Sequence, residues 1–94
     1  MSNRHFVIVT LDTKANGRSR DLQGTLNRAA DWIEIKPDTW LLWTGVSAKS
    51  WYFRFKPQLQ DGERLFACRI DHVDRGGLMP GAFWDFVKGK VGGD

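Results

Sequence analysis

The most constraining feature of the chain is a run of six residues near its start, Phe6 to Leu11, that is apolar or β-branched throughout. A strand with one face in water alternates polar and apolar residues, whereas a strand covered on both faces stays apolar along its length. The run therefore predicts a central strand that packs on both faces. It ends at Asp12, and an Asn-Gly pair within residues 13–18 predicts a loop after it.

The length of the chain limits it to one hydrophobic core. With 94 residues and 41% hydrophobic content, it has too little apolar surface for two. We therefore predict a single domain over residues 1–94, with its core at about 5–71 and a C-terminal extension at about 72–94. Residues 81–87 of the extension are rich in aromatic side chains and are expected to form a short helix that packs on the domain or on a partner.

Two segments have apolar residues at helical spacing. The first has Ser19 as its expected N-cap and a stripe formed by Leu22, Leu26, Ala29, Ala30 and Ile33. The second has Ser47 as its expected N-cap and a stripe formed by Trp51, Tyr52, Phe55 and Leu59. Pro57 is expected to kink or end the second helix near Phe55, because proline lacks the amide hydrogen that the helix requires.

Three more segments read as strands. Residues 32–36 and 39–44 form a hairpin with its turn at Pro37-Asp38, and residues 64–70 form the fourth strand. The order strand, helix, strand, strand, helix, strand predicts an α+β fold of the ferredoxin-like βαββαβ type. Such a fold has an antiparallel sheet with both helices on one face.

The second face of the predicted sheet needs a cover of its own. A symmetric homodimer, helped by the C-terminal extension, is the simplest cover, and we expect Trp40, Trp43 and Trp84 to lie at its interface. The alternative role for the five tryptophans is stacking on unpaired bases, but aromatic residues at strand and helix spacing are more often core or interface residues.

The net charge of +3 is concentrated near the N-terminus. Residues 1–20 hold four basic residues and one acid, while the remaining 74 residues hold ten of each. Lys14, Arg18 and Arg20 are therefore candidates for holding the phosphates of a nucleic acid without reading its sequence. The alternative is a set of solvated charges with no partner.

The sequence predicts a cytoplasmic protein with no membrane segment. Cys68 is the single cysteine, so no disulfide forms within the chain. The chain also has no secretory apolar segment at its start and no apolar stretch of about 18 residues that would span a bilayer.

Several short motifs together carry a family resemblance. They are the strand that ends in Thr10-Leu11-Asp12, the segment Asp38 to Thr44, and the segment Asp61 to Phe66. With the strand order, they make the chain, over roughly residues 5–87, resemble the small ferredoxin-fold proteins related to the CRISPR adaptation subunit Cas-two. These include SinR-like relatives and, more distantly, the VapD toxins.

The resemblance implies a homodimer in which the two first strands end at a central cleft. Asp12 matches the aspartate that is proposed to bind a divalent metal in this family, so Mg²⁺ or Mn²⁺ is the implied cofactor. Asp12 would then be catalytic in a weak metal-dependent endonuclease acting on RNA or DNA, with the hydroxyl of Thr10 or Thr13 assisting. The alternative is that Asp12 only ends its strand by hydrogen bonding to the following loop.

A second function class stays open beside the nuclease. The sheet and the segment around Trp84 would serve a non-catalytic module for protein interaction or assembly. The two histidines, His5 and His72, would form a transition-metal site near Asp71 and Asp74 if they lay together, but no close His/Cys spacing supports this and we expect surface residues. The sequence has no Gly-rich phosphate loop, nucleophile elbow or zinc-ribbon spacing.

Overall fold

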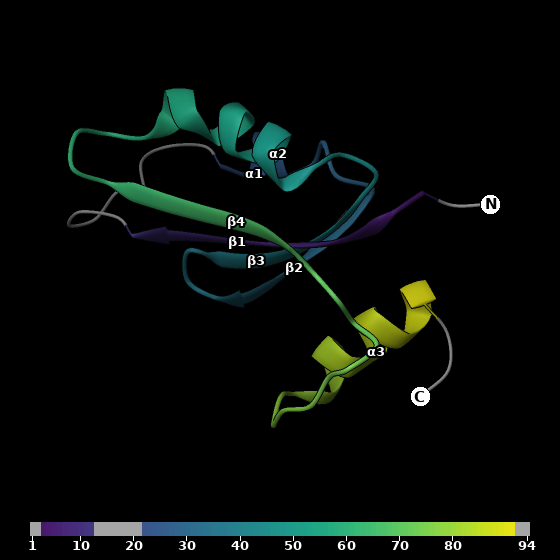
Figure 1. Ribbon diagram of the computed structural model, residues 1–94. Helices are drawn as coiled ribbons and strands as arrows, with labels where there is room; N and C mark the ends of the chain where they lie inside the picture. Colours follow the sequence, from purple (N-terminus) through teal and green to yellow (C-terminus); the bar gives the residue numbers. More distant parts are fainter. Residues whose placement is uncertain (1–2, 13–21, 92–94) are drawn as a thin grey trace.

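A computed structural model describes residues 3–12 and 22–91 and has an antiparallel sheet with helices on both of its faces (Figure 1). In chain order, the elements are β1 (His5–Asp12), α1 (Gln23–Leu26), β2 (Asp31–Lys36), β3 (Thr39–Thr44), α2 (Ala48–Phe55), the 3₁₀ turn η2 (Lys56–Gln58), β4 (Arg64–Ile70) and α3 (Gly81–Val91). The four strands lie in the order β2-β3-β1-β4, and each neighbouring pair is antiparallel.

The central position predicted for the first strand is confirmed. β1 pairs with β3 on one side and with β4 on the other. Its side chains alternate between two apolar clusters, with Val7 and Val9 pointing into one and Phe6 into the other, and all three are almost fully buried. The apolar residues at both alternations of β1 are therefore explained by cover on both faces of the sheet.

The larger cluster lies between the sheet and α2. Trp51 and Phe55 of α2 pack on the β1 side chains together with Trp40 and Leu42 of β3. The helix begins as expected, because the Ser47 hydroxyl accepts a hydrogen bond from the amide of Ser50 at 3.2 Å. It also ends where Pro57 predicted, since α2 stops at Phe55 and the chain continues in η2.

The first helix is shorter than its sequence pattern predicted. Within the described residues, α1 covers only Gln23–Leu26, and the expected N-cap Ser19 lies outside the described residues. The predicted helix was wrong after Leu26, because the residues that follow form hydrogen bonds with the sheet. The amide of Ala30 donates to the carbonyl of Trp43 at 2.9 Å, and Ile33 belongs to β2.

The smaller cluster lies between the sheet and α3, on the face opposite α1 and α2 (Figure 1). Val87 of α3 packs against Phe6 and Leu41, and the helix is longer than the segment 81–87 that the sequence indicated. At its C-terminal end, the ammonium of Lys90 pairs with the carboxylate of Asp31 on β2 at 2.6 Å. The chain's own extension therefore covers part of the face that a second copy was expected to cover.

The described elements form a small α+β protein with a four-stranded antiparallel sheet, as predicted. The hairpin turn lies at Pro37-Asp38, where Asp38 adopts a positive φ of 66°, a conformation that aspartate tolerates better than most residues. The arrangement is compatible with a ferredoxin-like fold, to which α3 is an addition.

Trp40 tests the packing of the larger cluster. Its side chain is 5% exposed and its ring is stacked on Phe55 with 6.2 Å between the ring centroids. We expect Trp40→Ala to lower the free energy of unfolding by about 3–5 kcal/mol, because it leaves a cavity in the core. Phe53→Ala, which removes a ring that is 53% exposed, should change it by about 0.5 kcal/mol or less. Urea unfolding of the two variants measures both changes in the free energy of unfolding. Equal changes would contradict the assignment of Trp40 to the core.

The Lys90–Asp31 pair makes the attachment of α3 depend on pH. The hydrogen bond from Lys90 lowers the pKa of Asp31 below its ordinary value of 3.8. The pair therefore stabilises the folded protein at neutral pH. This stabilisation is lost as the pH falls through the lowered pKa that Asp31 has in the folded state. We expect Asp31→Asn to cost about 1 kcal/mol or less at pH 7, since the pair is partly exposed, and this cost should disappear as the pH falls through the lowered pKa of Asp31. Thermal unfolding across this range measures the difference, and a cost that persists in acid would contradict it.

Candidate nucleic-acid interface

The sheet face that carries α3 is covered only in part. β1 and β4 pair so that Thr10 lies opposite Phe66 and Asp12 lies opposite Arg64. Because residues opposite each other on antiparallel strands share a face, these four side chains stand together where β1 ends and β4 begins. We call them the open sheet end. α3 lies toward the other end of the sheet (Figure 1).

The open sheet end is a shallow hollow with a volume of about 370 Å³. Phe66 is the main apolar group there, and 61% of its surface is exposed. An aromatic ring with this exposure on a strand offers a flat apolar surface for stacking against another flat group.

Asp12 is held by an ion pair that the sequence did not reveal. Its Oδ2 accepts a hydrogen bond from Nε of Arg64 at 3.0 Å and a second one from Nη2 of the same guanidinium. The two residues lie 52 positions apart, so only the register of β1 against β4 brings them together. Both side chains are largely exposed, at 60% for Asp12 and 81% for Arg64.

The described residues of one chain do not by themselves make up the implied Mg²⁺ or Mn²⁺ site. Among residues 3–12 and 22–91, no group of three or more acidic, histidine or cysteine side chains could hold a metal ion. Asp12 is paired with a guanidinium, and the hydroxyl of Thr10 is hydrogen bonded to that of Thr39 at 2.9 Å. Hard cations require several oxygen ligands, and among the described residues the open sheet end supplies one carboxylate, that of Asp12.

The basic residues expected to bind phosphate belong to the segment that follows β1. Lys14, Arg18 and Arg20, and also Thr13, lie outside the described residues. They follow Asp12 directly in the sequence, so the chain leads from the open sheet end into its most basic segment. Arg64 is thus the one basic residue in the described open sheet end, and sequence reasoning missed it because nothing in its local pattern distinguishes it.

The three tryptophans assigned to a dimer interface have different surroundings. Trp40 is buried beneath α2, so its side chain has no surface left for a second copy. Trp43 is half-buried against Phe6, with 4.8 Å between the ring centroids. Trp84 is half-buried on α3, where it meets the ring of Phe83 edge-on at 5.2 Å. A dimer interface stays a prediction for Trp43 and Trp84.

The two histidines have partners of their own within the chain. His5 lies with Nε2 at 3.0 Å from the carbonyl of Val46, and His72 packs edge-on against Phe6 with 5.9 Å between the ring centroids. These contacts hold the two rings at the start of β1 and just after β4. They account for both histidines as structural residues.

Comparison with family models, with curated proteins and with solved structures finds no match to this chain. In the described part of the chain, no helix has the length and apolar character needed to cross a membrane.

Proposed function

We propose that the protein is a homodimeric, nucleic-acid-associated protein on a ferredoxin-like scaffold, and that it holds single-stranded nucleic acid at the open sheet end. The observation that carries this proposal is the pairing on one sheet face of an exposed aromatic ring, Phe66, with an exposed guanidinium, Arg64. A ring that stacks on a base and a cation that holds the adjacent phosphate are the two elements of single-strand binding.

The ion pair with Asp12 leaves Arg64 available for phosphate. An exposed pair contributes only about 0–1 kcal/mol, because water screens both charges. A phosphate that arrives with a stacked base therefore competes well with the carboxylate for the guanidinium. Lys14, Arg18 and Arg20 would add backbone contacts that do not depend on sequence.

Separate observations support the ferredoxin-like scaffold and the homodimer in this proposal. The element order and the strand order β2-β3-β1-β4 support a ferredoxin-like scaffold. A sheet face that is only partly covered supports a second copy, and the half-buried Trp84 offers it an aromatic surface.

Cleavage of the bound strand is the part of the proposal that needs the second copy. Mg²⁺ or Mn²⁺ would have to be shared by the Asp12 residues of two chains, since the described residues of one chain supply too few oxygen ligands. Binding at Phe66 and Arg64 has no such requirement. Nucleic-acid binding is therefore the primary proposal, and metal-dependent endonuclease activity is secondary to it.

The binding surface is tested by replacing its two residues. We expect Phe66→Ala to weaken binding of a labelled single-stranded oligonucleotide by about tenfold, because the stacking surface is lost. Arg64→Gln should lower the slope of log affinity against log salt by about 0.7, the value for one phosphate contact on a single strand. Fluorescence anisotropy at several salt concentrations measures both effects on DNA and RNA.

Arg69→Gln is the matched control for these variants. Arg69 is an exposed arginine of the same strand, but it lies opposite Val7 and so belongs to the other face of the sheet. Its loss should leave the affinity within about twofold of that of the native protein. If the native protein shows no binding at low salt, the nucleic-acid proposal fails. The non-catalytic assembly module then becomes the better proposal, and the exposed Val73 and Leu78 support it.

Asp12→Asn separates binding from cleavage. Removing the carboxylate frees Arg64 and removes a negative charge, so the variant should bind the oligonucleotide about two- to tenfold more tightly. Any magnesium-dependent cleavage by the native protein should be absent from the variant. Gel analysis with and without Mg²⁺ detects cleavage, and cleavage that survives in Asp12→Asn would exclude Asp12 as the metal ligand.

A further inference from the structure

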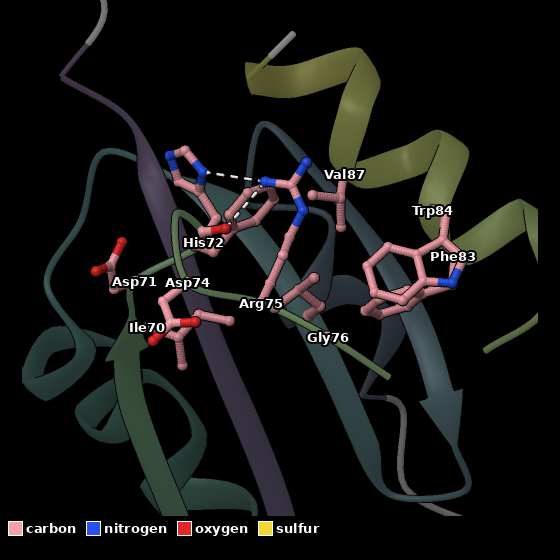
Figure 2. Close-up of a pocket in the computed structure, with 11 residues that line it drawn as sticks. Ile70, Asp71, His72, Asp74, Arg75, Gly76, Phe83, Trp84 and Val87 are labelled. Atoms are coloured by element: carbon pink, nitrogen blue, oxygen red, sulfur yellow. Dashed lines mark hydrogen bonds between the residues drawn. The ribbon is translucent and has the colours of Figure 1, made fainter. Parts of the chain in front are cut away.

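A second hollow, with a volume of about 270 Å³, lies between α3 and the segment that follows β4 (Figure 2). It is separate from the open sheet end and shares no lining residue with it. Its volume is just below the roughly 300 Å³ at which pockets for drug-sized ligands begin, so a ligand would be small.

The floor of the hollow is apolar. Phe6, Leu41 and Val87 are almost fully buried and form its base, with Ile70 beside them. Trp84 and Phe83 of α3 form the wall of the hollow that faces the segment after β4 (Figure 2). A group that reaches this floor must itself be apolar, because a buried polar atom without a hydrogen-bond partner costs about 1–3 kcal/mol.

The rim of the hollow carries charges of both signs. Arg75 reaches across from the segment after β4, and its Nη1 donates to the carbonyl of His72 at 2.9 Å and lies 3.5 Å from Nδ1 of that ring (Figure 2). Asp71 and Asp74 line the same side. Among the described residues, Arg75 uses only Nη1 in hydrogen bonds and forms no ion pair with either aspartate.

We propose that this hollow binds a free α-amino acid with an apolar side chain, of the size of leucine or phenylalanine. The carboxylate of the ligand accepts from the free nitrogens of Arg75, its ammonium group lies against Asp74 or Asp71, and its side chain rests on Phe6 and Val87. A zwitterion matches a rim with both charges, and an apolar side chain matches the floor.

Other small ligands fit this hollow less well. A simple apolar anion would face two carboxylates on the rim as well as one guanidinium. A nucleobase carries polar atoms around most of its edge, and those that reached the apolar floor would lose their hydrogen bonds. The proposal does not depend on nucleic-acid binding at the open sheet end, because the two sites have no residue in common.

The test is a titration of the uniformly ¹⁵N-labelled full chain with L-leucine and with L-phenylalanine. The five tryptophans give separate indole N–H signals, and Trp84→Phe identifies the signal of the residue in the wall. We expect both amino acids to shift the Trp84 signal in a saturable way. Glycine, 3-phenylpropionate and phenethylamine, which lack the side chain, the ammonium and the carboxylate respectively, should bind about tenfold more weakly or not at all.

Two variants locate the site. Arg75→Gln and Asp74→Asn should each weaken binding of phenylalanine by about tenfold or more, since each removes one charged partner. Asp74 is exposed, so its replacement leaves folding intact, and Arg69→Gln is the matched control that should bind like the native protein. No shift with either amino acid, or equal binding of 3-phenylpropionate, overturns the proposal. Guanosine binding in place of phenylalanine overturns it as well.

Discussion

The structure depends on β1 being buried on both faces at the centre of the sheet. β1 has Val7 and Val9 on one face and Phe6 on the other. One layer of helices can bury the side chains of only one face, so each face needs its own apolar cover. α2 supplies the first cover and α3 supplies part of the second. Residues close together in β1 thus belong to two clusters, and the helices that meet them come from distant parts of the chain.

The same strand sets the position of the candidate binding surface. Because β4 pairs with β1 in antiparallel register, the end of β1 meets the beginning of β4, and Asp12 meets Arg64. The pair neutralises a carboxylate that would otherwise repel a phosphate, while both groups remain in water. This suits a surface that exchanges partners more than it suits a metal centre, since a metal requires several converging oxygen ligands.

Much of the fold followed from local patterns in the sequence. The unbroken apolar run of β1, the Pro37-Asp38 turn, the Ser47 cap and the helix break at Pro57 each depend on near neighbours, so the sequence alone revealed them. The length of α1 was overestimated because its apolar spacing continued past Leu26, while the competing hydrogen bond from Ala30 to Trp43 joins residues 13 positions apart.

The candidate site was harder to predict, because it also depends on contacts between residues that are far apart in the sequence. Asp12 was identified from its place at a strand end, but its partner Arg64 lies on a strand whose register no local pattern specifies. The exposure of Phe66 was also hidden, because an apolar run such as residues 65–68 predicts cover on both faces of β4. β4 is an edge strand, and whether its second face is covered depends on where α3 lies.

The length of α3 explains why the hollow beside this helix and the open sheet end lie apart on one face of the sheet. Its 11 residues make a helix of about 16 Å, whereas the eight residues of β1 extend for about 26 Å, so one helix cannot cover the full length of the sheet. Where α3 meets the sheet, Val87 and Trp84 enclose a small apolar hollow with a charged rim. Beyond the helix, Phe66 and Arg64 are left in water. A small zwitterion with an apolar side chain would therefore suit the covered end, while a large, flexible and charged ligand would suit the open end.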